Sequence, residues 1–399
     1  MTSEGERPVA GPLAGIKVLE LQGRGPAPFG TMVLADLGAD VVTIARVADV
    51  DVEGESAAER MAAGRRRIDL ATRGKRSVAI DLKHPDGLAA AQRLVDHADV
   101  LTESNRPGVA ERLGLGPDAC LERNPRLIYA RMTGWGQHGT YASTPGHDIN
   151  YVALAGALEH LRRPGQAPMP PLNLLGDYGG GGMLLVVGIL AALVERGVSG
   201  RGQVIDAAMV DGVALLSTLF YGLRAEGLWS DEPGTNILDL GAPHYNVYET
   251  ADGRWITIGA GEAPFYRELL ERVGLDPALA DGQGDPTSWA AVTEQLAGVF
   301  ARKTLAEWRE ELEGTNTCFA PVLRMDEAPD HPHLRERATF VEVDGVVQPA
   351  PAPRFSRTPA ASPGAPVRAG QQTSDVLTTW GFRPDEVDQL RAAGAVAGG

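Results

Sequence analysis

Short apolar runs alternate with amphipathic segments along the first part of the chain. The run GIKVLELQG (residues 15–23) is typical of a buried strand, and so is DVVTIAR (residues 40–46). Between them, the apolar positions of PFGTMVLADLGAD (residues 28–40) have helical spacing. A strand–helix–strand order of this kind predicts a parallel sheet and an α/β fold.

The same alternation continues to about residue 228. Further strands are predicted at residues 78–83, 99–104, 126–136 and 202–209. Helices are predicted at residues 85–98, 149–161, 183–194 and 211–227. We therefore expect a large α/β domain that spans residues 1–228.

The pattern changes after residue 228. Two alternating runs around ADGR, within residues 245–260, predict a β-hairpin, and helical spacing follows at three places up to residue 314. We expect a small α+β domain at residues 229–330. Residues 331–399 are expected to return to the large domain, first as a proline-rich extended strap and then as a short helical segment.

Composition narrows the class of protein. The 399 residues carry a formal net charge of −15, which disfavours binding to nucleic acid or to an anionic membrane. The two cysteines, Cys120 and Cys318, exclude a disulfide framework, and neither has the spacing of a metal site. The longest apolar run, residues 183–194, is shorter than the roughly 20 residues of a membrane span. We expect a cytoplasmic protein without a metal or a membrane span.

A titratable pair precedes one of the predicted helices. His147 and Asp148 lie in GHDINYVALAGALEHL, directly before apolar residues with helical spacing. Both residue types can simply cap a helix, and this pair taken alone favours that interpretation. The alternative is chemical, because the unpaired N–H groups at a helix start can hold an oxyanion.

Three other features are open to a similar choice. Asp177 precedes four glycines, which indicate a capped flexible turn, a close approach to the backbone or the crossing of two helices. Glu262 follows a strand and precedes a helix, where a first-turn glutamate is common. Basic side chains could bind a phosphorylated ligand or form a solvated face, namely Arg46, Arg65, Arg66, Arg67, Arg73, Lys75, Arg76, Lys83, Arg106 and Arg112.

Several motifs together resemble one family. GKRSVAIDLK, RLIYARMTGWGQ, GHDINY, PLNLLGDYGGGG, GQVIDAAMVDG and GAPHYNVYETADGRW look like the α-methylacyl-CoA racemases, within the class III (formyl-CoA-transferase-like) CoA-transferase family. The resemblance covers nearly the whole chain. It implies an interlocked homodimer with a large parallel-sheet, Rossmann-like domain and an inserted small domain. It also implies that each active site lies between the large domain of one subunit and the small domain of the other.

The resemblance also implies roles for individual residues. His147 and Asp177 would be the two acid/bases, Glu262 would pair with the histidine across the dimer, and Asn173 would support the aspartate. The backbone N–H of Asp148 would stabilise an enolate oxygen. The expected reaction is the interconversion of (2R)- and (2S)-2-methylacyl-CoA by 1,1-proton transfer, with no cofactor beyond the CoA of the substrate.

The resemblance further implies a set of residues that contact the acyl-CoA substrate. These are Arg46, Ala79, Ile80, Asp81, Leu82, Lys83, Glu103, Ser104, Asn105, Arg106, Arg112, Gly146, Ile149, Asn150 and Tyr151. The chain departs from the family pattern at residues 45–47, 236–241 and 260–266, which leaves acyl specificity open. Two alternatives remain: a CoA-transferase that uses Asp177 as a nucleophile, and a noncatalytic acyl-CoA-binding protein.

Overall fold

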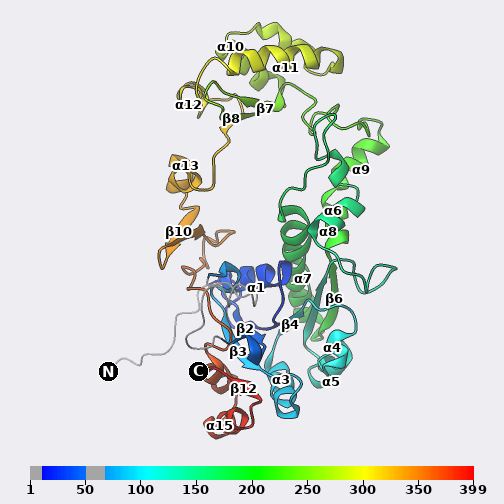
Figure 1. Ribbon diagram of the computed structural model, residues 1–399, viewed down its shortest axis with the longest axis vertical. Helices are drawn as coiled ribbons and strands as arrows, with labels where there is room; N and C mark the ends of the chain where they lie inside the picture. The colour runs from blue at the N-terminus through cyan, green and yellow to red at the C-terminus, as the bar shows by residue number, and fades with distance from the viewer. Residues whose placement is uncertain (1–10, 51–67) are drawn as a thin grey trace. The chain divides into compact units, whose positions relative to one another are not determined.

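A computed structural model describes residues 11–50 and 68–399 (Figure 1). The chain divides into two compact units. The large unit comprises Met1–Ala155, Leu172–Leu216 and Glu336–Gly399, and the small unit comprises Gly156–Pro171 and Ser217–Arg335. The longer segment of the small unit therefore begins at Ser217 rather than at residue 229. The unit also includes Gly156–Pro171, which the sequence pattern assigned to the large domain.

A seven-stranded sheet forms the centre of the large unit, in the order β12-β3-β2-β1-β4-β5-β6. Its strands are β1 (Lys17–Leu21), β2 (Asp40–Ala45), β3 (Arg76–Ile80), β4 (Val100–Glu103), β5 (Ile128–Thr133), β6 (Gln203–Ala208) and β12 (Val396–Ala397). Every pairing from β3 to β6 is parallel, which confirms the predicted α/β class. The antiparallel edge strand β12 lies in a segment that the sequence pattern assigned to a helix.

Helices cover both faces of this sheet, which explains why its central strands are nearly continuous apolar runs. One core lies between the sheet and α3 (Pro85–His97), α5 (Pro117–Arg123), α14 (Thr373–Thr379) and α15 (Pro384–Ala392). The other lies between the sheet and α1 (Pro26–Asp36), α6 (Asp148–Leu154) and α7 (Leu184–Ser199). The helices α4 (Val109–Arg112) and α8 (Met209–Leu216) complete the large unit.

Two predicted helices are shorter than expected. Helix α6 ends at Leu154 because Gly156 has a φ of 84°, a left-handed conformation that terminates the helix, so the predicted helix through residue 161 is wrong. The segment 211–227 breaks at Ser217 into α8 and α9 (Thr218–Ala225). The strap also contains a regular element, the antiparallel hairpin of β10 (Phe340–Val343) and β11 (Val346–Pro349).

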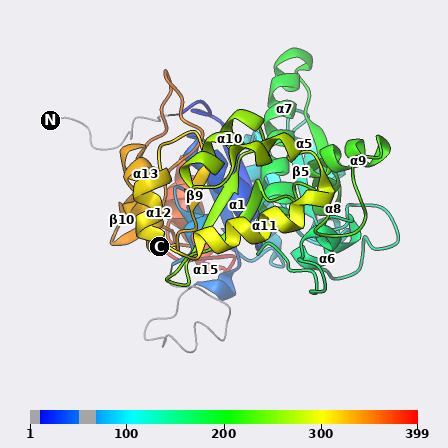
Figure 2. The same cartoon turned by 90° about the horizontal axis from the view of Figure 1, so that it is seen from above.

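The small unit confirms the predicted hairpin. Its three-stranded sheet has the order β7-β8-β9, with β7 (Tyr245–Glu249), β8 (Trp255–Gly259) and β9 (Phe319–Pro321). Helices α10 (Ala263–Arg272), α11 (Pro286–Phe300) and α12 (Leu305–Leu312) pack on it, and α13 (Pro332–Glu336) follows (Figure 2). Fully buried Phe300 and Trp308 stack edge to face in its core.

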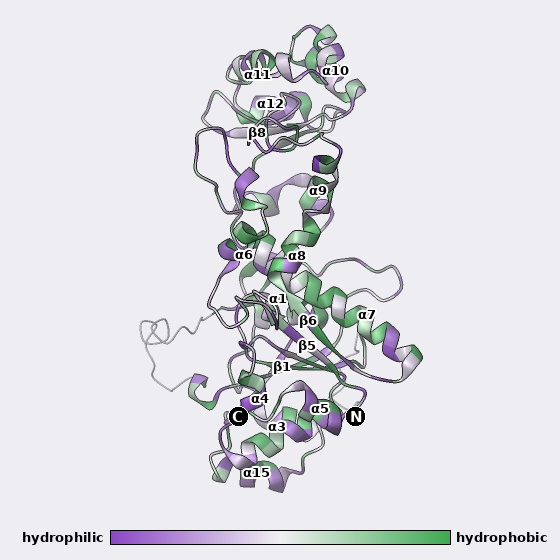
Figure 3. Cartoon of the chain, turned by 90° about the vertical axis from the view of Figure 1, so that its right-hand side faces the viewer, coloured by the Kyte–Doolittle hydropathy of each residue, from purple (hydrophilic) through white to green (hydrophobic). Residues whose placement is uncertain are grey.

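Helix α7 carries a strongly apolar sequence (Figure 3). Together with the preceding helical segment, Leu174–Met183, it forms one helical stretch, Leu174–Ser199, that could span a membrane by length and composition alone. Leu185 and Ile189 on this helix are fully buried against the sheet. The helix is thus a structural part of the large unit, although Val187, Val194 and Val198 remain exposed.

Candidate active site

The strand order places a site at the carboxyl edge of the parallel sheet. Strand β1 lies between β2 and β4. The chain therefore adds its next strands on one side of β1, up to β3, and then on the other side from β4 onward. Connections after such neighbouring strands leave in opposite directions and leave room for a ligand. The loops after β1 and β4 meet at this point, because a Cβ built on Gly23 would lie 2.1 Å from Oγ of Ser104.

The four glycines allow a helix to enter this crowded edge. Residues Leu174–Met183 form a π-helix, η4, a conformation that is frequent at functional sites. A Cβ on Gly180 would lie 2.9 Å from the backbone N of Val213 in α8, and one on Gly182 would lie 2.7 Å from the carbonyl oxygen of Pro26 in α1. The glycines therefore allow close packing of η4 against α1 and α8, as the predicted crossing of helices requires.

Asp177 in η4 faces the loop after β1. A Cβ built on Gly25, the residue before α1, would lie 3.4 Å from Oδ2 of Asp177. The same oxygen accepts a hydrogen bond from Nδ2 of Asn173 at 2.7 Å. The structure thus brings Asn173 to Asp177, as the sequence analysis expects.

His147 directly precedes helix α6. It is the N-cap residue, with extended backbone angles, and its N–H donates to Oδ1 of Asn150 at 3.0 Å. This confirms that the titratable pair stands at a helix start. The next residue, Asp148, is 3% exposed, and its Oδ2 accepts a hydrogen bond from the backbone N–H of Asp177 at 2.7 Å. Residues 29 positions apart are therefore linked directly.

The environment of Asp177 changes its acidity. Burial raises the pKa of the Asp177 carboxyl above its ordinary value, and the neighbouring charge of Asp148 raises it further. The hydrogen bond from Asn173 and the proximity of His147 act in the opposite direction. A carboxyl whose pKa is moved toward neutrality is better able to both accept and donate a proton.

Tyr151 forms the apolar side of the same region. Its ring packs edge to face on Trp135, with centroids 4.7 Å apart. Burial raises the pKa of Tyr151 to about 12, with the charge of Asp177 adding to the effect and that of Arg106 opposing it. This electrostatic influence relates Arg106, in the loop after β4, to Tyr151.

Some of the other predicted acyl-CoA contacts follow strands at the same edge, and the rest lie at helices α4 and α6. Ala79 and Ile80 end β3 and are buried, and Asp81, Leu82 and Lys83 form the turn that follows. Arg46 follows β2 as an exposed side chain that pairs with Asp49 at 2.8 Å. Arg112 is exposed at the end of α4. Gly146 and Ile149 flank the histidine–aspartate pair, and Ile149 is exposed.

Glu103, predicted to contact the substrate, is instead buried inside the large unit. Its side chain is fully buried, and its Oε1 lies 2.9 Å from Nε of Arg131. Its Oε2 accepts the backbone N–H of Asn105 at 2.7 Å. Glu103 therefore holds the turn that carries Ser104, Asn105 and Arg106, instead of presenting its own carboxylate to solvent.

Part of the basic stretch is structural. Lys75 pairs with Glu20 at 2.8 Å and Arg73 with Asp36 at 2.6 Å, and all four side chains are buried. Arg76 pairs with Asp40. The hypothesis of a phosphate site is wrong for Arg73 and Lys75, because both side chains are buried and form ion pairs with carboxylates. Arg65, Arg66 and Arg67 lie outside the described residues.

Glu262 belongs to the small unit. It is exposed and is the N-cap residue of α10, one position before the predicted first turn. Gln283, which no sequence motif singles out, donates through Nε2 to the carbonyl oxygens of Ala260 at 3.0 Å and Gly261 at 2.8 Å. These two hydrogen bonds to consecutive carbonyl oxygens fix the turn that presents Glu262. No local sequence signal marks a glutamine for such a role.

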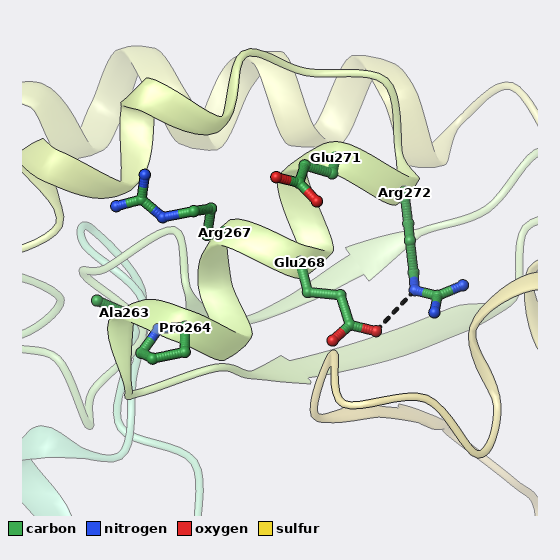
Figure 4. A pocket seen from close by; sticks show the side chains of 6 residues that line it. All are labelled: Ala263, Pro264, Arg267, Glu268, Glu271 and Arg272. Atoms are coloured by element: carbon green, nitrogen blue, oxygen red, sulfur yellow. Dashed lines mark hydrogen bonds and ion pairs between the residues drawn. The ribbon is translucent and has the colours of Figure 1, made fainter.

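A surface pocket lies along α10, next to this turn (Figure 4). It is lined by Ala263, Pro264, Arg267, Glu268, Glu271 and Arg272. Its cations are already paired, Arg272 with Glu268 at 2.9 Å and Arg267 with Asp281 at 2.8 Å. No predicted catalytic residue lines it, so it is not the candidate site. Among the described residues, no cluster of histidine, cysteine or carboxylate side chains could hold a metal ion.

Comparisons with known proteins agree with the geometry. Residues 13–373 match the family model described as CoA-transferase family III. The chain is 46% identical to an alpha-methylacyl-CoA racemase of Mus musculus and 43% identical to one of Homo sapiens, over 95% of this chain and 96% of each relative. A crystal structure of a CAIB/BAIF family protein from Brucella suis aligns with a TM-score of 0.77 at 25% identity, covering 93% of this chain and all of that one.

Proposed function

Because this chain belongs to CoA-transferase family III, we propose that it is a racemase that interconverts (2R)- and (2S)-2-methylacyl-CoA thioesters. The mouse and human relatives that carry this name support the assignment. The observation that carries the proposal is the hydrogen bond from the N–H of Asp177 to Oδ2 of Asp148. Because Asp148 directly follows His147, this bond holds the Asp177 carboxyl, whose pKa is raised, close to the start of α6.

The proposed reaction uses His147 and Asp177 on opposite faces of carbon 2 of the acyl group. In one direction the ionised Asp177 removes the proton from carbon 2, and the electron pair of the C–H bond moves toward the thioester oxygen to give an enolate. Protonated His147 then delivers a proton to the other face of carbon 2, and the reverse direction exchanges the two roles. The backbone N–H of Asp148, at the first position of α6, lies where a helix supplies no backbone partner and is suited to the enolate oxygen. One such donor lowers the barrier by roughly 3–4 kcal/mol.

We further propose that the enzyme is a homodimer in which Glu262 of the partner subunit orients His147. Support comes from the family resemblance and from exposed apolar side chains in the large unit that a second copy would cover. These are Val187, Val194 and Val198 on α7 and Leu215 and Leu216 on α8. Sedimentation analysis tests this, and a monomer at micromolar concentration would contradict it.

The substrate's CoA moiety is proposed to bind along the loops after β2, β3 and β4. Arg46, Lys83 and Arg106 follow these strands and can contact phosphate groups. We also propose a cytoplasmic location, because both cysteines are free thiols, and no resident cofactor, because the thioester itself acidifies the carbon-2 proton. Exhaustive dialysis against a chelator leaves activity unchanged if the second point is right.

Proton NMR of one pure epimer in deuterium oxide tests the reaction. Loss of the signal of the proton on carbon 2, together with the appearance of the other epimer, is the expected result. If several 2-methylacyl chains show no exchange, the racemase proposal fails. Transfer of CoA to an added carboxylate would then favour the CoA-transferase alternative with Asp177 as nucleophile. Thioester binding without turnover, unaffected by Asp177→Asn, would indicate a noncatalytic binding protein.

A further inference from the structure

We propose that the side chain of Asp148 is a positioning residue for this reaction: its buried carboxylate fixes the backbone of Asp177 and places a negative charge beside that catalytic group. The inference rests on the proposed function and adds a role for the Asp148 side chain, as distinct from its backbone N–H. Asp148 acts through Asp177 and is not itself a base in the reaction.

The fit between Asp148 and η4 is specific. Oδ2 of Asp148 accepts the Asp177 N–H at 2.7 Å. The residue before Asp177 is Gly176, and a Cβ built there would lie 2.5 Å from the same oxygen. Any side chain at position 176 would therefore displace the carboxylate. Gly176 and Asp148 together determine where the π-helix presents Asp177.

The charge of Asp148 has no evident structural purpose. Asp148 is 3% exposed, and its Oδ1 has no hydrogen-bond partner among the described residues. An asparagine could accept the Asp177 N–H equally well without burying a charge. A buried charge at this position points to an electrostatic function, since enzymes adjust the pKa of an acid/base group by burial and by neighbouring charges.

The charged and titratable groups around this pair are few. His147 and Tyr151 lie on α6 with Asp148, and Arg106 acts from the loop after β4. On η4 itself, Tyr178 carries a phenol and packs edge to face on Phe29 of α1, and the N-cap residue Asn173 is neutral. The residues of α1 and α8 that pack against the glycines of η4 carry no charge, namely Pro26, Phe29, Gly30, Met209, Gly212, Val213 and Leu216. Asp148 therefore is the anion that acts on Asp177, and its charge raises the pKa of that carboxyl.

The variant Asp148→Asn tests the proposal, because it keeps an acceptor for the Asp177 N–H and removes the charge. The acid limb of the pH profile of kcat/KM, in the direction in which Asp177 is the base, is expected to move to lower pH. We expect kcat to fall roughly tenfold with KM nearly unchanged, as for a misadjusted acid/base group. Asp118→Asn, an exposed first-turn aspartate of α5, is the matched control and should change neither.

A readout independent of turnover separates this proposal from the proposed function. Carbon-13 NMR of carboxyl-labelled aspartate, assigned with Asp177→Asn, reports the titration of Asp177 directly. A lower pKa of Asp177 in Asp148→Asn supports the inference even if wild-type protein shows no proton exchange, in which case only the racemase reaction is lost. An unchanged Asp177 titration and pH profile in a folded Asp148→Asn variant overturns it. If Asp148→Asn does not fold, Asp148→Glu, which keeps the charge, must retain the wild-type titration.

Discussion

The side-chain amide of Asn173 donates a hydrogen bond of 2.7 Å to Oδ2 of Asp177, four residues further along the same helical segment. This bond stabilises the ionised carboxylate, whereas burial and the charge of Asp148 stabilise the protonated form. Two opposing influences thus act on one carboxyl, from positions that can be changed separately.

Removal of the Asn173 amide should raise the pKa of Asp177 further. In Asn173→Ala the acid limb of kcat/KM moves to higher pH, opposite to the shift expected for Asp148→Asn. A hydrogen bond to a charged group contributes about 1.5–3 kcal/mol, which corresponds to a roughly 10- to 100-fold lower kcat near neutral pH. Steady-state kinetics against pH measures this. The exposed Asn316→Ala is a control, and a shift to lower pH would contradict the assignment.

Asp177→Asn should abolish racemisation and stabilise the fold at neutral pH. The pKa of Asp177 is raised in the folded chain, so its ionisation costs folding free energy. That cost is absent below the ordinary aspartate pKa and complete above the raised one. The variant therefore melts at a higher temperature than wild type at about pH 8 and loses this advantage toward about pH 4. Calorimetry checks it, and a variant that is less stable across this range would disprove the argument.

Co-expressed variants can locate the proposed partner contribution. His147→Ala and Glu262→Ala are each expected to be inactive as homodimers. If each site combines His147 of one subunit with Glu262 of the partner subunit, a mixed dimer contains one intact site. An equal mixture then recovers roughly a quarter of wild-type activity, because half of the dimers are mixed. Tandem affinity purification isolates the mixed dimer, and a persistent lack of activity there would place both residues of a site in one chain.

The buried Lys75–Glu20 pair should contribute to stability and not to catalysis. Nζ of Lys75 also donates to Oγ1 of Thr31 and to the carbonyl oxygen of Pro28. Lys75→Ala leaves the Glu20 carboxylate buried without its cation, which costs about 3–5 kcal/mol of unfolding free energy. Denaturant titration measures it. The exposed pair of Arg383 and Asp385 provides the control, since Arg383→Ala should leave the midpoint unchanged. A loss below about 1 kcal/mol for Lys75→Ala would refute the structural role.

Arg106→Ala should weaken binding of the CoA moiety. The side chain is exposed in the loop after β4, where Glu103 holds the backbone. We expect KM and the inhibition constant of free CoA to rise roughly tenfold, about 1.4 kcal/mol, with little change in kcat. Arg123→Ala, which removes a surface partner of Asp96, is the matched control. A fall in kcat at constant KM would assign Arg106 to the chemical step instead.

The local sequence pattern predicted many of the secondary-structure elements of this protein. Alternation and apolar runs predicted the parallel strands and the small-unit hairpin, because burial of one or both faces leaves a period along the chain. The start of α6 at His147 and the close packing at the glycines of η4 also follow from residue types. The catalytic roles of His147, Asp177 and Glu262 came from the resemblance of whole motifs, and they stay predictions.

Other features depended on contacts that no local pattern encodes. The two-residue strand β12 exists only because the chain end reaches the edge of β3. Arg73 and Lys75 look like surface cations in sequence, and only their buried carboxylate partners, 37 and 55 residues away, make them structural. The link from Asp148 to Asp177 is of the same kind. Sequence period reports which face of an element is buried, whereas the tertiary structure decides which side chains meet there, and the acidity of Asp177 follows from that meeting.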